Sequence, residues 1–177
     1  MIKKYLFLIG ILLLLASCGG SKKISHNSSE ERRNNASEIS KNDVFDEKND
    51  SSLFAVTDAA KAFLGTRYKY GGTSKSGMDC SGLIYTAFLQ GNIPLPRTSR
   101  AMSLEGERID LEEAMVGDLL FFETNKNKKV INHVGLVVES RQNEINFIHS
   151  TTSRGVIISN LNENYWRQHF VMARRVN

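Results

Sequence analysis

The stretch Met78-Asp79-Cys80-Ser81-Gly82-Leu83 decides how the fold is built, because here a loop passes into a helix that begins with a cysteine. The glycine and serine residues between Gly71 and Gly77 indicate the loop. From about Cys80 to Leu89, apolar side chains recur at helical spacing. The buried face expected for this helix consists of Leu83, Ile84, Ala87 and Phe88.

Cys80 is one of only two cysteines in the 177-residue chain. The other, Cys18, directly follows a predicted export signal and is accounted for there, so we expect no disulfide within the chain. Unpaired N–H groups and the positive end of the helix dipole stabilise an anion, which predicts a lowered pKa for the Cys80 thiol. The same N–H groups can hold an oxyanion. The plainer alternative is a small buried apolar side chain.

Secondary-structure patterns predict helices first and strands second. The helices are expected at Ala55–Leu64, Cys80–Leu89 and Ser99–Leu104. Short β-branched or aromatic runs follow at Leu119–Phe122, Val134–Val138, Ile145–Ile148 and Val156–Ile158. Because helices and strands do not alternate, the pattern favours an α+β fold, with N-terminal helices packed on a central antiparallel sheet.

Two histidines flank the second and third of these strands. A hairpin whose turn is centred on Arg141 places His133 directly opposite His149. Opposed residues have Cβ atoms ~5 Å apart and point to the same face, so the two imidazoles can share a proton. A register slip of one residue sends them to opposite faces.

These residues predict nucleophilic chemistry without a metal or an organic cofactor. His133 is expected to take the proton of Cys80, and His149 to orient His133. The two histidines can exchange these roles on sequence alone. A zinc site at Cys80, His133 and His149 is the alternative, but no Cys-x-x-Cys or His-x-x-x-His spacing supports it. His26 and His169 are interpreted as structural or surface residues.

The N-terminus predicts export. Residues 1–17 contain a short cationic start and an apolar run too short to span a bilayer, as in a signal peptide. Leu15-Ala16-Ser17-Cys18 resembles a lipobox, whose cysteine carries the lipid anchor of the mature protein; an ordinary cleaved signal is the alternative. Residues 18–52 are polar and are interpreted as a linker. Residues 53–177 form the one predicted domain.

Charge gives a weak indication of partners. The chain has a formal net charge of +4. The basic residues of the domain are scattered apart from Lys126, Lys128 and Lys129, which are typical of a solvated turn. The pattern therefore argues against a nucleic-acid partner, and a weak positive charge suits an anionic wall polymer.

Six motifs together resemble the NlpC-type family of bacterial cell-wall cysteine peptidases, which have a papain-like arrangement. They occur in the order typical of that family and cover nearly all of residues 60–150. The motifs are Gly65-Thr66-Arg67-Tyr68-Lys69-Tyr70-Gly71-Gly72, Asp79-Cys80-Ser81-Gly82-Leu83, Leu95-Pro96-Arg97-Thr98-Ser99, Gly117-Asp118-Leu119-Leu120-Phe121-Phe122, His133-Val134-Gly135-Leu136 and Phe147-Ile148-His149-Ser150.

The resemblance implies a triad of Cys80, His133 and His149. It also implies that Tyr68 lies near the thiol and helps bind the oxyanion or the substrate; the alternative is a packing aromatic. Asp79 and Ser81 match positions that hold a free substrate amine in relatives cutting at an amino terminus. Asp79 is an equally good helix cap.

By this resemblance, the chain is expected to be a monomeric, lipid-anchored endopeptidase that cuts peptidoglycan stem peptides. The expected bond joins D-glutamate to a diamino acid, cleaved through a thioester. Gly19 replaces the aspartate that retains some lipoproteins in the inner membrane, which favours the outer membrane, facing the periplasm. An acyl- or amide-transferring enzyme and an inactive wall-binding envelope protein are the alternatives.

Overall fold

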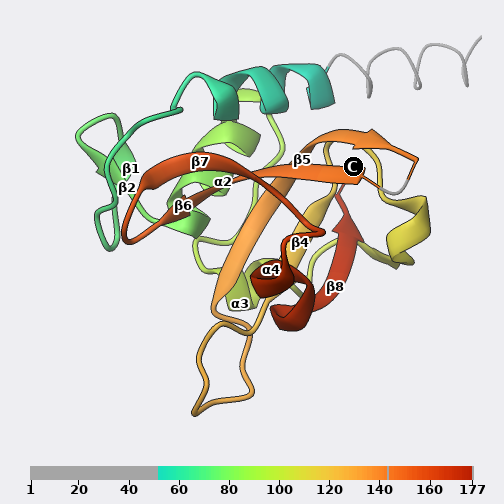
Figure 1. Ribbon diagram of the computed structural model, residues 1–177. Coiled ribbons are helices and arrows are strands. Elements are labelled where there is room, and N and C mark those ends of the chain that lie inside the picture. The colour runs from blue at the N-terminus through green and yellow to red at the C-terminus, as the bar shows by residue number, and fades with distance from the viewer. Residues whose placement is uncertain (1–51, 143, 177) are drawn as a thin grey trace, which may run out of the picture. The chain divides into compact units, whose positions relative to one another are not determined.

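A six-stranded antiparallel sheet, in the order β3-β8-β4-β5-β6-β7, forms the centre of the fold (Figure 1). The computed structural model describes residues 52–142 and 144–176. The predicted signal peptide, Cys18 and the linker up to residue 51 lie outside the described residues. In chain order the strands of this sheet are β3 (Glu107–Ile109), β4 (Leu119–Phe122), β5 (His133–Arg141), β6 (Glu144–Thr151), β7 (Gly155–Asn160) and β8 (Phe170–Arg175).

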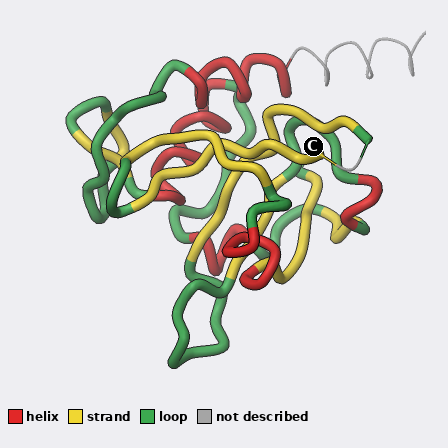
Figure 2. Tube along the Cα trace, in the orientation of Figure 1, coloured by secondary structure: helices red, strands yellow, loops and turns green. Residues whose placement is uncertain are grey.

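Helices and a small hairpin surround the sheet. A first helix covers residues 52–61. The other elements are β1 (Thr73–Ser74), β2 (Gly77–Met78), α2 (Cys80–Gln90), α3 (Ser99–Met102), the 3₁₀ helix η1 (Leu111–Glu113) and α4 (Asn164–His169). The α+β arrangement predicted from the sequence is confirmed. Figure 2 shows the long loop between β4 and β5 reaching away from the sheet.

Each face of the sheet carries its own apolar core. Leu83, Ala87 and Phe88 of α2 pack against one face, as the helical spacing predicts. On the other face, Phe122 and Trp166 belong to a second cluster, in which Trp166 comes from α4. Burying each such side chain contributes roughly 1.5–3 kcal/mol. The sheet is thus fixed from both sides, and its strand ends are free to carry polar groups.

The hairpin of β5 and β6 differs in register from the prediction. Val137 lies opposite Phe147 and Arg141 lies opposite Glu144, with a bulge between Val137 and Glu139. The predicted direct pairing of His133 with His149 is therefore wrong, because near the histidines the register differs by two residues. An even shift keeps both side chains on one face, where they are diagonal neighbours.

Several short elements had no clear signal in the sequence. β8, which lies between β3 and β4, reads Phe-Val-Met-Ala-Arg-Arg and shows no alternation of apolar and polar residues. β3 is a charged segment of three residues, and α4 has six. Elements this short depend on tertiary pairing rather than on local pattern.

Candidate active site

The loop before α2 is fixed by Asp79, which caps the helix. Asp79 Oδ1 accepts the N–H of Gly82 at 2.6 Å, and Oδ2 accepts the N–H of Gly71 at 2.7 Å. Arg97 pairs with the same carboxylate at 3.0 Å. Burial raises the pKa of Asp79, but the hydrogen bonds from Arg97, Gly82 and Gly71 outweigh it, so the net pKa is lowered. The carboxylate is therefore charged and presents Cys80 at the first turn of α2.

Ser81 belongs to the same network. Its hydroxyl accepts from Arg97 at 2.8 Å and donates to Asp79 Oδ1 at 3.3 Å. Both Asp79 and Ser81 are buried, and neither lines the cleft that contains Cys80. In this geometry they position the helix start. Their contact with a substrate amine stays a prediction.

The Cys80 sulfur lies against the first residues of β5. The thiol donates weakly to the carbonyl of Asn132 at 4.0 Å, and the N–H groups of Val134, Ser81 and Cys80 itself point toward the sulfur. Burial nevertheless raises the pKa of the Cys80 thiol above its ordinary value, and the charge of Asp79 adds to this. The expectation of a lowered thiol pKa is thus wrong, because desolvation outweighs the N–H groups at the helix start.

Behind the sulfur, His133, His149 and Ser159 form a chain of buried polar groups. His133 Nε2 lies 3.0 Å from His149 Nδ1, and His149 Nε2 lies 3.0 Å from the hydroxyl oxygen of Ser159. His133 Nδ1 has no hydrogen bond to another described residue. This nitrogen belongs to a side chain that lines the cleft with Cys80. The chain therefore leaves one ring nitrogen available for the thiol.

Aromatic side chains enclose the two imidazoles. The Trp166 ring stacks on His133 with a centroid distance of 5.4 Å and an interplanar angle of 20°, and meets His149 edge-on at 4.6 Å. Burial lowers the pKa of His133 to about 4. Burial, His133 and Arg154 lower the pKa of His149 to about 2. Both rings are therefore neutral at neutral pH, and the Cys80 thiol, which lines the same cleft as His133, is protonated.

A cleft of about 410 Å³ gives access to this group. Tyr68, Cys80 and His133 line it, together with the β6–β7 turn and α4. Burial raises the pKa of Tyr68, and electrostatic interactions with Cys80 and Asp79 add to this, so the phenol is protonated at neutral pH. The cleft thus brings together a thiol, an imidazole and a phenol hydroxyl.

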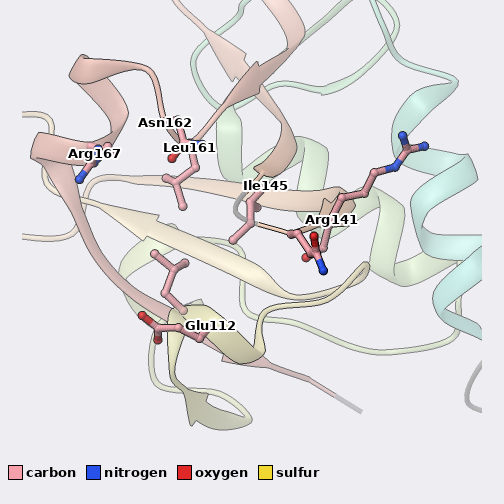
Figure 3. Close-up of a pocket in the computed structure, with 9 residues that line it drawn as sticks. Glu112, Arg141, Ile145, Leu161, Asn162 and Arg167 are labelled. Carbon is pink, nitrogen blue, oxygen red and sulfur yellow. The ribbon is translucent and has the colours of Figure 1, made fainter.

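A larger cavity, of about 780 Å³, is lined by a different set of side chains (Figure 3). Its labelled lining residues are Glu112, Arg141, Ile145, Leu161, Asn162 and Arg167. Arg141 already pairs with Glu139 at 3.0 Å. Neither cysteine nor histidine is among the residues that line this cavity. The smaller cleft, lined by both Cys80 and His133, is therefore the candidate site.

The remaining candidates lie outside the cleft. His169 Nδ1 bonds locally to the carbonyl of Tyr165 at 2.7 Å, in keeping with a structural role, and His26 lies outside the described residues. Within residues 52–142 and 144–176, no three or more His, Cys, Asp or Glu side chains gather in a way that suits a metal ion. In the same residues, no helix has the length and apolarity needed to span a membrane.

Two neighbours of the histidines were missed from the sequence. Ser159 directly follows the predicted strand Val156–Ile158, was assigned no role from the sequence, and is 4% exposed. Trp166 is the only tryptophan of the chain, which was the one available signal. The spacing of residues in the sequence predicts neither the Ser159–His149 contact nor the contacts of Trp166 with the histidines. Both arise only when the sheet folds and places β7 and α4 beside the histidines.

Comparison with known proteins identifies relatives across the chain. The profile of the NlpC/P60 family matches residues 65–175. A probable endopeptidase NlpC homolog from Haemophilus influenzae is 32% identical over 192 residues, covering 99% of this chain and 100% of the relative. The Escherichia coli K12 protein named murein DD-endopeptidase MepS/murein LD-carboxypeptidase is 35% identical, covering 68% of this chain and 61% of the relative. A gamma-DL-glutamyl hydrolase from Bacillus subtilis is 37% identical, covering 72% of this chain and 30% of the relative.

Solved structures share the fold. An NLP/P60-family protein from Staphylococcus aureus, described as similar to lipoprotein, is 33% identical with a TM-score of 0.62. The match covers 72% of this chain and 42% of that one, so this chain spans less than half of the solved protein. The resemblance inferred from the motifs and the α+β, papain-like fold are both confirmed.

The buried histidines predict a loss of stability in acid. Unfolded imidazoles take up protons near pH 6.5, whereas folded His133 does so only near 4, so the free energy of unfolding falls as the pH drops through this window. His133 alone contributes on the order of 3 kcal/mol. Urea unfolding at pH 7 and pH 4.5 measures the loss. His133→Gln should reduce it and His169→Gln should not; an unchanged loss in His133→Gln would contradict the assignment.

The raised thiol pKa predicts slow alkylation. In a Cys18→Ser variant, iodoacetamide should modify Cys80 at pH 7 more slowly than it modifies free cysteine, with a pH midpoint above that of an ordinary thiol. Mass spectrometry of the modified peptide follows the rate, and Cys80→Ser gives the background. A midpoint below the ordinary value would show that the helix start outweighs burial after all.

Proposed function

The chain belongs to the NlpC/P60 family, and we propose that it is a cysteine peptidase that hydrolyses amide bonds in peptidoglycan stem peptides. The observation that carries the proposal is the cleft lined by both Cys80 and His133, with the buried His149 hydrogen-bonded to His133. Relatives with endopeptidase and glutamyl hydrolase names support hydrolysis of a wall peptide rather than of a protein.

The first proposed step is attack by the Cys80 sulfur on the scissile carbonyl carbon. His133 Nδ1 accepts the thiol proton as the S–C bond forms, and Nε2 of the resulting imidazolium donates to His149 Nδ1. Because thiol and imidazole are both neutral at rest, proton transfer accompanies the attack. The oxyanion is held by N–H groups at the start of α2 and by the Tyr68 hydroxyl.

The second step releases the products. His133 returns the proton to the leaving nitrogen, the C–N bond breaks, and a thioester remains on Cys80. A water molecule, deprotonated by His133, attacks the thioester and releases the acid with the free thiol. No external oxidant, reductant or cofactor enters the balance.

We assign the scissile bond to the link between D-glutamate and a diamino acid. The name of the B. subtilis relative supports a glutamyl bond, whereas the E. coli relative is named for D,D and L,D bonds. The proposal also includes a lipid on Cys18, a monomeric enzyme, and a place in the bacterial cell envelope at the outer membrane, facing the periplasm.

Defined muropeptides test the reaction. The wild type should convert a tetrapeptide stem into two fragments whose masses sum to that of the substrate plus one water, as measured by mass spectrometry. Cys80→Ala and His133→Ala should each lower kcat by at least about a hundredfold, because each removes the nucleophile or its base. Amide-linked products with no free amine would point to transfer instead. Unchanged cleavage by Cys80→Ala would sink the proposed mechanism.

Ser159 is proposed as a positioning residue for His149. Ser159→Ala leaves the buried His149 Nε2 without its partner, at a cost of ~1–3 kcal/mol, so kcat should fall by about tenfold with little change in KM. Ser159→Thr, which retains a hydroxyl, should recover most of the loss. Ser140→Ala removes a comparable hydrogen bond, to Ala114, far from the cleft, and serves as the matched control. Equal kcat losses in Ser159→Ala and Ser140→Ala would reduce Ser159 to a general structural role.

A further inference from the structure

Arg154 is a charged group in the cleft that the proposed reaction does not use. It lies in the turn between β6 and β7 and lines the cleft together with Cys80 and His133. The turn itself is fixed, because the N–H of Arg154 donates to Thr151 Oγ1 at 3.1 Å and Gly155 has a φ of +68°. The backbone is thus held in place while the exposed side chain extends from a rigid base.

The guanidinium of Arg154 has no ion pair within the described residues. Three other arginines do: Arg97 with Asp79, Arg141 with Glu139, and Arg175 with Asp118. The acid that lines the same cleft, Glu163, accepts instead from the N–H of Asn160 at 2.9 Å. Arg154 therefore offers an unpaired guanidinium fork to whatever enters the cleft.

The charge of Arg154 also reaches the histidine pair. It helps to lower the pKa of His149, which hydrogen-bonds to His133. An anion bound to Arg154 would offset this positive charge while substrate occupies the cleft.

We propose that Arg154 binds a free carboxylate of the stem peptide next to the scissile amide. This inference rests on the proposed function and extends it to substrate selection. A D-glutamate linked through its γ-carbonyl keeps its α-carboxylate free, and a diamino acid such as diaminopimelate carries a second carboxylate. A guanidinium can bind either group through two parallel hydrogen bonds, whereas a carboxamide lacks the charge.

Matched substrates separate the two carboxylates. Three stem peptides are compared: one with both carboxylates free, one with the glutamate α-carboxyl amidated, and one with the second carboxyl of the diamino acid amidated. The wild type should lose about ten- to a hundredfold in kcat/KM on the amidated form whose carboxylate Arg154 holds. The Arg154→Ala variant should cleave the peptide with both carboxylates free as slowly as the wild type cleaves that amidated form. Arg154→Lys should recover part of the preference for the free carboxylate.

Arg100→Ala is the control, because Arg100 is exposed on α3 and lines neither cavity. Binding of the three peptides to Cys80→Ala, measured by calorimetry, provides a readout that needs no turnover. Equal affinity for all three peptides, or a carboxylate preference that survives Arg154→Ala, would overturn the inference. Absence of cleavage by the wild type with a preserved binding preference would instead count against the proposed function alone.

Discussion

One bulge in β5 determines whether this chain can assemble its histidines. Near the turn, Arg141 pairs with Glu144; continued without interruption, that register would place His149 opposite Leu136, on the face that α2 covers. The extra residue between Val137 and Glu139 changes the register by one, and His149 then shares a face with His133. With the inserted residue, the ring nitrogens of the two imidazoles lie 3.0 Å apart. Without it, the two imidazoles would lie on opposite faces of the sheet.

Burial on that face of the sheet determines the protonation states of the two histidines. His149 is fully buried and His133 is 8% exposed, and both lie against Trp166. In such surroundings a charge is expensive, so the rings stay neutral and the thiol keeps its proton. An ion pair of thiolate and imidazolium at rest would need solvation that this site does not supply. The proposed mechanism therefore depends on a base that is ready to accept a proton, not on a preformed thiolate.

Much of the scaffold could be predicted from local pattern, while the precise contacts of the site could not. The period of Leu83, Ile84, Ala87 and Phe88 predicted α2 because all four face one core. The run Leu119–Phe122 matched β4 because it is buried on both faces. The hairpin register was predicted wrongly because the turn lies between Arg141 and Glu144 and is not centred on Arg141, and because the bulge adds a further shift of one residue. The predicted direction of the Cys80 pKa shift was wrong because the position of a residue in a helix can be read from the sequence, whereas its desolvation in the folded chain cannot.

The cleft joins segments distant in sequence into one rigid rim. Gly155 packs so closely on the loop that carries Tyr68 that a Cβ there would lie 2.2 Å from the carbonyl oxygen of Thr66. Ser150, at the end of β6, donates to the carbonyl of Met78, two residues before Cys80. The turn carrying Arg154, the Tyr68 loop and the start of α2 are therefore held against the same strands. This packing would couple the proposed substrate selection by the turn to the proposed attack by the sulfur, since both segments rest on the same strands.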